Sequence, residues 1–278
     1  MATWKIAGVQ MDVRLGDRAG NLAAIRARLH EAAGRGARLV VFPECALCGY
    51  AFDSKEEALP HGEPVPGPST LAVAEDCRQL GVWAAFGLLE RGAANALFNA
   101  CALVGPAGLV GVYRKVHLPF LGVDRFTTPG DRPFRVHDLG GLRIGMLICY
   151  DGSFPEAARV LALRGADLIV LPTNWPPGAR TTATYLVPAR ALENHVYFLA
   201  VNRVGEERGF RFIGQSRLVD CDGEPLTLVA GNGEETLYGE VDPARARAKR
   251  LVKIPGKYEI DRLADRRPEM YGPLCEPK

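Results

Sequence analysis

The chain has 278 residues, of which 47% are hydrophobic and 24% charged, and its net charge is +2. This length and balance are ordinary for a soluble globular protein, and they suit one large domain or two small ones with a sizeable core. The single basic run is the short segment ARARAKR at 244–250, so the composition argues against nucleic-acid binding.

The sequence predicts a cytoplasmic protein without membrane contact. No stretch approaches the roughly 18 apolar residues of a membrane helix, and the first residues, MATWKIAGVQMDV, lack a basic segment followed by an apolar one. The seven cysteines are odd in number and scattered through apolar segments. This pattern indicates reduced thiols and not a disulfide framework.

In chain order, the first elements predict a β-α-β unit. Residues 4–11 alternate with period two and predict a strand, and residues 21–36 carry apolar side chains at helical spacing. Residues 37–44 (ARLVVFPE) form an apolar strand that ends at Glu44. We expect the two strands to lie parallel in one sheet.

The middle of the chain predicts antiparallel strands, and the later part returns to an α/β alternation. A meander of three strands is expected at 81–90, 95–104 and 108–116. Two hairpins are expected, one over 134–149 and one turning at 221–224. Between them we expect helices near 155–164 and 180–194 and strands at 166–172 and 196–204. These elements predict mixed sheets covered by helices.

Three predicted strands end on side chains suited to covalent catalysis. An acid, an ammonium and a thiol follow apolar runs, at Glu44, Lys115 and Cys149. Ligands gather where strands end and loops begin. A carboxylate can accept a thiol proton, and a lysine can stabilise the anion formed by thiolate attack. Singly, each residue also has a structural explanation: a buried apolar cysteine, a capping glutamate or a solvated lysine.

The neighbours of these residues resemble the signature blocks of the nitrilase superfamily, the carbon–nitrogen hydrolases. The resemblance is carried by VVFPECALCGY, YRKVHLP and GMLICYDGSFPE, followed by ADLIVLPTNWP and ARALENHVYFLAVNRVG. It implies a four-layer α-β-β-α sandwich with mixed sheets and a catalytic triad of Glu44, Lys115 and Cys149. It also implies one domain over 1–278, with a core at about 4–240 and a C-terminal extension at about 241–278.

The resemblance implies the chemistry as well. Glu44 would take the proton of Cys149, and the thiolate would attack an amide carbon. Lys115 and the backbone N–H of Tyr150 would hold the oxyanion. Water activated by the same carboxylate would then hydrolyse a thioester on Cys149. Neither a metal nor an organic cofactor is needed.

Two positions depart from the family pattern. Many members carry a second glutamate after the lysine, which positions substrate and lysine, whereas this chain has Val123 there and Asp124 beside it. Either Asp124 substitutes after a one-residue shift or the role is absent. We expect an incomplete substitute, because aspartate is one methylene shorter. Ser153 stands where many relatives have arginine, which bears on the substrate subclass.

Several other residues have both a structural and a functional interpretation. Cys45 and Cys48 have CxxC spacing, but the sequence has no second such pair, so a core or pocket-wall position is favoured over a metal site. His117 and His195 invite a Cys-His hydrolase interpretation. For His117 a supporting or surface position is favoured over a catalytic one.

Two further segments are expected near the site. Asn174 and Trp175 follow the strand at 166–172, so they should lie at the sheet edge of Cys149, as pocket wall or as packing. Glu193 is either an exposed helix charge or, by the family resemblance, a supporting partner of Lys115.

The function expected from these features is hydrolysis of a small linear amide or N-carbamoyl compound. The alternatives are a nitrilase that attacks a nitrile and a non-catalytic family member that binds a ligand, against which the intact triad argues. The family resemblance also implies a homodimer or larger homo-oligomer. The apolar stripes of the helices near 155–164 and 180–194 are wider than a single surface helix needs.

Overall fold

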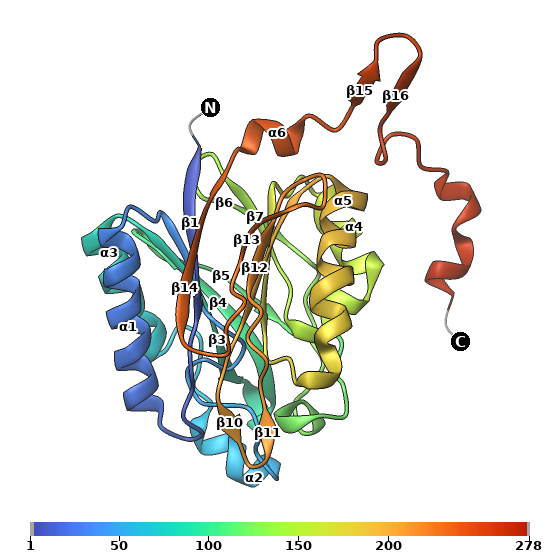
Figure 1. Cartoon of the computed structure of the whole chain (residues 1–278). Coiled ribbons are helices and arrows are strands. Elements are labelled where there is room, and N and C mark those ends of the chain that lie inside the picture. The colour runs from blue at the N-terminus through green and yellow to red at the C-terminus, as the bar shows by residue number, and fades with distance from the viewer. Residues whose placement is uncertain (1–2, 277–278) are drawn as a thin grey trace.

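The structure, a computed structural model, describes residues 3–276 and is built around two six-stranded sheets (Figure 1). The first has the order β14-β1-β2-β3-β4-β5, with strands β1 (Trp4–Gln10), β2 (Leu39–Val41), β3 (Trp83–Arg91), β4 (Leu97–Gly105), β5 (Gly108–Arg114) and β14 (Glu235–Val241). The second has the order β13-β12-β9-β8-β7-β6, with strands β6 (Val136–Asp138), β7 (Arg143–Met146), β8 (Leu168–Thr173), β9 (Tyr197–Asn202), β12 (Arg217–Val219) and β13 (Pro225–Leu228).

The pairing of the early strands confirms the β-α-β unit. β1 and β2 are parallel, with Ile6 opposite Leu39, and helix α1 (Arg18–Gly34) connects them. The Asp17 side chain caps α1 by accepting a hydrogen bond from the Gly20 N–H at 2.9 Å. The antiparallel meander β3-β4-β5 and the hairpins β6-β7 and β12-β13 are also as expected.

Helices cover the outer face of each sheet, and the two inner faces share a core (Figure 1). α1 and α3 (Pro68–Leu80) lie on the first sheet; α4 (Pro155–Leu163) and α5 (Val187–Asn194) lie on the second. Fully buried Ile6 of the first sheet and Ile144 of the second belong to one apolar cluster. The fold is therefore the expected four-layer α-β-β-α sandwich.

Two helical segments differ from the sequence-based expectation. The expected helix at 180–194 opens with a wide π-type turn, Thr182–Leu186, before α5. Pro188 has no backbone N–H to donate to residue 184, and such a gap favours the wider turn. Helix α3 was not predicted, because its buried face carries one aliphatic residue, Val73, among small and polar ones.

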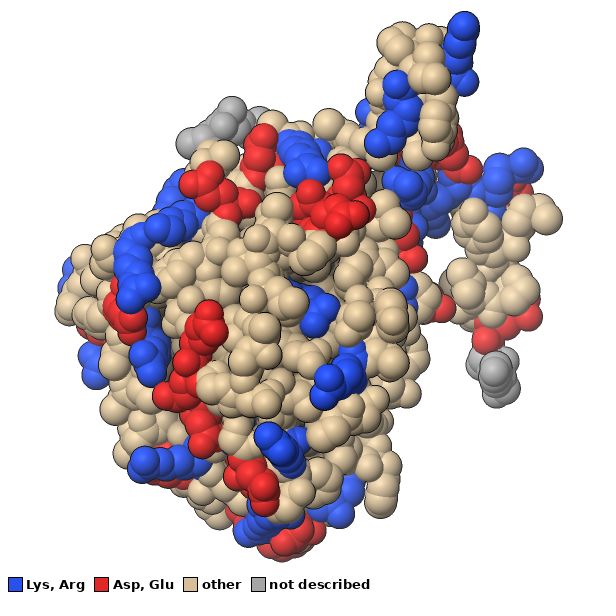
Figure 2. All heavy atoms as spheres, in the orientation of Figure 1, with Lys and Arg blue, Asp and Glu red and all other residues tan. Residues whose placement is uncertain are grey.

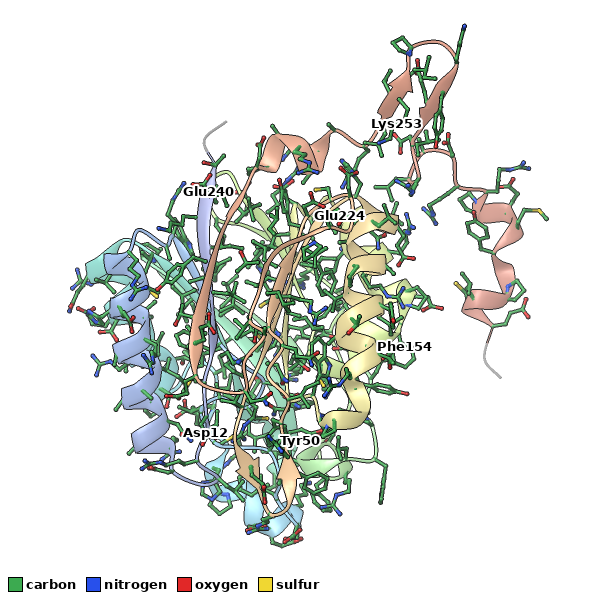
Figure 3. The ribbon with its side chains drawn as sticks, viewed as in Figure 1. Asp12, Tyr50, Phe154, Glu224, Glu240 and Lys253 are labelled. Carbon is green, nitrogen blue, oxygen red and sulfur yellow. The ribbon has the colours of Figure 1, made fainter. Side chains whose placement is uncertain are left out.

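The C-terminal segment leaves the body of the molecule after β14. Helix α6 (Pro243–Arg247) leads to a separate hairpin of β15 (Leu251–Ile254) and β16 (Tyr258–Ile260), which projects away from the sandwich and carries Lys253 (Figures 1 and 3). Smaller elements are α2 (Lys55–Ala58), β10 (Glu206–Glu207) and β11 (Phe210–Arg211). Within residues 3–276 no helix is long and apolar enough to cross a bilayer. On the face shown in Figure 2, acidic and basic side chains are interspersed.

Candidate active site

Cys149 sits on a tight turn between a strand and a helix. It begins the 3-10 turn η4 (Cys149–Ser153), which lies between β7 and α4. Its φ of +46° is left-handed, a conformation that costs a non-glycine residue about 1–3 kcal/mol. Turns of this kind hold a nucleophile at the edge of a sheet. The residue is buried, so its sulfur does not lie on an open surface.

Glu44 and Lys115 form a fully buried ion pair. Lys115 Nζ lies 2.7 Å from Glu44 Oε1, and neither side chain is exposed. Burial raises the pKa of Glu44, although the Lys115 charge opposes the shift. Burial alone would lower the pKa of Lys115, but the carboxylates of Asp124 and Glu44 raise it well above its ordinary value. Lys115 is therefore a permanent ammonium.

Asp124 is the second carboxylate on Lys115. Its Oδ2 lies 2.5 Å from Lys115 Nζ and accepts a hydrogen bond from the Tyr50 hydroxyl at 2.8 Å. The turn η3 (Gly122–Arg125), which opens at Gly122 with a φ of +49°, directs Asp124 inward, while Val123 packs among apolar side chains. Asp124, and not Val123, is therefore the residue of this turn that contacts Lys115. Tyr50 lies at the end of the sandwich away from α6 (Figure 3).

Asn99 joins the two carboxylates and was missed in the sequence. Its Nδ2 donates to Glu44 Oε1 at 2.7 Å and to Asp124 Oδ1 at 2.8 Å. The available signal was a polar residue near the start of the apolar strand LFNACALVG. Glu44 Oε2, by contrast, is buried and has no hydrogen-bond partner within residues 3–276. The network therefore fixes one oxygen of Glu44 and leaves the other available.

The thiol of Cys149 lies within the electrostatic influence of this pair. Burial and the Glu44 charge raise the pKa of Cys149 to about 12, while Lys115 and hydrogen bonding from the Asn174 backbone oppose the rise. The resting thiol is therefore neutral at neutral pH. Its attack on a substrate requires a base, because the thiolate is the reactive form.

A third buried carboxylate, Asp151, holds the turn after Cys149. Its Oδ2 accepts hydrogen bonds from the Tyr113 hydroxyl at 2.7 Å and the Ile148 N–H at 3.0 Å. Its Oδ1 accepts from the His117 N–H at 3.0 Å and lies 2.7 Å from His117 Nδ1. The His117 ring stacks on Phe154 with centroids 3.7 Å apart. His117 thus contacts the turn and not the reacting sulfur.

Three other candidates lie beside Cys149 in the sequence or at its sheet edge. β7 and β8 are parallel, so Asn174 and Trp175 follow β8 at the edge where Cys149 follows β7. Asn174 is buried, and neither side-chain polar atom has a hydrogen-bond partner within residues 3–276. Buried amides without partners are costly, so this side chain suits a bound polar molecule. Trp175 is buried, and Tyr150 is 41% exposed.

Glu193 corrects one expectation, because it does not contact Lys115. It lies on α5 and accepts a hydrogen bond from Arg190 at 3.0 Å. Arg190 also donates to the carbonyl oxygens of Gly152 and Ser153, both at 3.1 Å. Lys115 already has two carboxylate partners on its own side of the sandwich. Glu193 therefore reaches the turn after Cys149 only through Arg190.

The remaining thiols and histidine lie apart from the reacting group. Cys45 and Cys48 are fully buried, and the Cys45 thiol contacts Asn99 Oδ1 at 3.7 Å. Cys45 therefore contacts the residue that binds Glu44. His195 ends α5, and its Nε2 lies 3.1 Å from the Arg245 carbonyl oxygen.

Comparison with known proteins extends the similarity over almost the whole chain. Residues 5–251 match the carbon–nitrogen hydrolase family. The chain is 39% identical over 268 residues to a nitrilase of Pyrococcus abyssi, covering 96% of this chain and 98% of the relative. It is 34% identical over 280 residues to an (R)-stereoselective amidase of Pseudomonas sp, covering 98% and 94%. It is 30% identical over 287 residues to an omega-amidase of Mus musculus, covering 98% of both.

Solved structures show the same fold. The amidase of Nesterenkonia sp. AN1, from the nitrilase superfamily, has a TM-score of 0.81 and 26% identity, covering 98% of this chain and 97% of that one. One structure of a variant of that amidase shows covalent addition of the acetamide moiety of fluoroacetamide at the active-site cysteine. Since sequence and fold agree from end to end, this chain belongs to the carbon–nitrogen hydrolase family, the nitrilase superfamily, and is a hydrolase.

Proposed function

We propose that this enzyme hydrolyses a small linear amide or N-carbamoyl compound through a thioester on Cys149 and releases ammonia or an amine. The observation that carries the proposal is the buried Oε2 of Glu44, which has no hydrogen-bond partner within residues 3–276, on a carboxylate close enough to influence the Cys149 thiol. Lys115 and Asn99 hold the other oxygen of the same carboxylate. A carboxylate held at one oxygen and free at the other is suited to moving a proton.

In the first half-reaction, Glu44 accepts the thiol proton as Cys149 Sγ bonds to the amide carbon. The carbonyl oxygen becomes an oxyanion, which Lys115 Nζ and the backbone N–H of Tyr150 stabilise. Loss of one such donor costs roughly 10²–10³ in turnover. Glu44 then gives its proton to the departing nitrogen, the C–N bond breaks, and the acyl group remains on sulfur as a thioester.

In the second half-reaction, Glu44 takes a proton from water, and the oxygen of that water bonds to the thioester carbon. The C–S bond then breaks, the sulfur takes back the proton, and the acid leaves. The raised pKa of Glu44 suits a group that alternates between base and acid. Asp124 keeps Lys115 charged and in place, and the Asn174 side chain offers an amide to a polar group of the substrate.

A nitrile is the second candidate substrate, because one relative at 39% identity is named a nitrilase. The same thiolate would form a thioimidate from a nitrile. Amides are favoured as substrates, because other relatives are named amidases and the solved neighbour is an amidase. A non-catalytic role is disfavoured because both the Glu44–Lys115 ion pair and the strained turn at Cys149 are present.

The proposed assembly is a homodimer, or a larger homo-oligomer, through the face formed by α4 and α5. This face carries exposed apolar side chains at Leu163, Tyr185 and Leu192. A groove of about 600 Å³ lies between α4 and the C-terminal segment, with an apolar lining that includes Val160 and Leu274. A monomeric mass in sedimentation at micromolar concentration would contradict this assembly.

The proposed organisation is one domain with its core at about 4–240 and a C-terminal extension from about 241. The proposed compartment is the cytoplasm. All seven cysteines are unpaired, and six are buried, which suits a reducing environment.

A screen for released ammonia over amides, N-carbamoyl compounds and nitriles tests the proposed function. We expect release from at least one amide or carbamoyl class, and loss of nearly all release in Cys149→Ala with an unchanged unfolding transition. Wild-type turnover in a folded Cys149→Ala protein would contradict the covalent mechanism.

A further inference from the structure

A cavity of about 380 Å³ lies at the side of the sandwich. Its walls come from β5, an edge strand of the first sheet, and from residues that lead into β6, the neighbouring edge of the second sheet. None of Glu44, Lys115, Asp124 and Cys149 lines it. A cavity of this size accommodates a small organic molecule.

The polar wall of this cavity is basic. Its lining residues include His137 and the exposed Arg132 and Arg135, and none of them is acidic. Arg132 has only a long contact, 3.9 Å, with Asp131, whose oxygens are both already 2.9 Å from Arg114. Arg135 makes no ion pair within residues 3–276. Two arginine charges are therefore incompletely compensated.

The ring of His137 lies directly against the backbone of β5. A Cβ at Gly111 would come within 2.3 Å of this ring, so only glycine permits the approach. Burial and the nearby Arg135 charge lower the pKa of His137. At neutral pH the ring is therefore a neutral hydrogen-bonding group, and the positive charge of the cavity comes from the two arginines.

The remaining wall offers apolar surface and backbone groups. Val110 and Val112 of β5 and Met146 of β7 supply aliphatic contacts. β5 ends the first sheet in the described part of the chain, so its outer backbone groups have no strand partner there. Arginine forks and backbone N–H groups both bind carboxylate or phosphate oxygens well.

We propose that this cavity is a binding site for a small organic anion, with a carboxylate or phosphate held by Arg132 and Arg135 and an apolar body against Val110, Val112 and Met146. The site is separate from the proposed hydrolytic centre. Its ligand is defined by two features together, the anionic head and the apolar body.

Calorimetric titration of the full-length protein tests this site with four probes. Phenyl phosphate and benzoate carry both features, inorganic phosphate has only the anion, and benzyl alcohol has only the apolar body. The variant is Arg132→Gln/Arg135→Gln. The matched control is Arg18→Gln/Arg78→Gln, which removes the same charge from exposed positions on α1 and α3. Thermal unfolding and amide turnover confirm that each variant is folded.

We expect saturable one-site binding of phenyl phosphate, benzoate or both, and the one that binds better identifies the head group. Affinity should fall by about tenfold or more in Arg132→Gln/Arg135→Gln, which corresponds to about 1.4 kcal/mol, and stay near wild type in the control. Three results would overturn the proposal: no saturable binding of either organic anion at millimolar concentration, equal affinity in the double variant, or equally tight binding of inorganic phosphate or benzyl alcohol.

Discussion

Glu44 and Asp151 are two buried carboxylates with different roles, one reactive and one structural. Asp151 has two contacts on each oxygen, from Tyr113, Ile148 and His117. Glu44 has both of its hydrogen bonds on Oε1, and Oε2 has no partner among residues 3–276. Burying a carboxylate costs several kcal/mol unless its oxygens are satisfied. A fully satisfied carboxylate holds the turn in place, and a half-satisfied one has an oxygen left for chemistry.

Glu44→Gln removes the reactive carboxylate, and we expect it to have the largest effect on turnover. Glutamine keeps the shape of glutamate but cannot accept the thiol proton. We expect kcat/KM for an amide to fall by about 10³–10⁴, the upper part of the range for a general acid–base group. Steady-state kinetics with a urea unfolding curve would measure both properties. Turnover within tenfold of wild type in folded protein would show that Glu44 is not the base.

Asp124→Asn should have a smaller effect on the same network. From the sequence alone we expect Asp124 to be an incomplete substitute for the second glutamate, and therefore only a modest loss. The 2.5 Å contact with Lys115 now favours a larger loss, because Asn keeps an oxygen but not the charge that holds the ammonium. We expect turnover to fall by about 10–100-fold, or about 1.4–2.8 kcal/mol.

The matched control for Asp124→Asn is Asp131→Asn in the same stretch of chain. Asp131 pairs with Arg114 and its side chain is 55% exposed, so its loss should leave turnover near wild type. Equal losses in the two variants would remove Asp124 from the site. A loss as complete as that of Glu44→Gln would instead place Asp124 on a par with the base.

Asp151→Asn should reverse the pattern, with more effect on stability than on turnover. In this variant the side-chain NH₂ group would face N–H or O–H donors that now donate to a carboxylate oxygen. Each hydrogen bond to a charged group contributes about 1.5–3 kcal/mol. We expect the unfolding free energy to drop by about 2–4 kcal/mol and turnover to fall tenfold or less. Chemical denaturation of Asp151→Asn beside Glu44→Gln gives the comparison. A stable, inactive Asp151→Asn protein would contradict a supporting role.

The pH dependence of kcat/KM should show the smallest effect, and it should also report on Glu44 as the reactive carboxylate. Burial raises the pKa of Glu44 above its ordinary value of 4.5. A protonated Glu44 cannot accept the thiol proton, so activity should rise with pH through this raised pKa. The acid limb of kcat/KM should therefore lie above pH 4.5. An acid limb at or below that value, measured with wild-type protein, would mean that Glu44 is not shifted or not the base.

The sequence predicted the strands that precede Glu44, Lys115 and Cys149, because each motif couples a polar or reactive residue to its local strand. It could not resolve Asp124 from Val123, since the choice depends on the left-handed Gly122 that starts the turn. Asn99 was missed because its partners lie 55 and 25 residues away. β14 was not predicted; its partner β1 lies at the other end of the chain, and most of β14 is partly exposed.

Helix faces were harder to interpret than strand ends. The sequence left Glu193 open as an exposed helix charge or a supporting partner of Lys115, whereas Arg190, three residues earlier on α5, binds it. The pairing in the helix follows from i,i+3 spacing, which brings oppositely charged side chains together. Which residues the helix faces across the sandwich depends on packing that the local pattern does not contain.

The most direct test of the account is covalent trapping of the nucleophile with fluoroacetamide, followed by peptide mass spectrometry. Cys275 is the one exposed cysteine, so the reaction is run on Cys275→Ser as the parent protein, with Cys149→Ala and Glu44→Gln built on it. The account predicts a single acetamide adduct on Cys149, absent from Cys149→Ala and formed more slowly in Glu44→Gln. An adduct on Cys45 or Cys48, or an unreactive Cys149 in a protein that turns over amides, would contradict it.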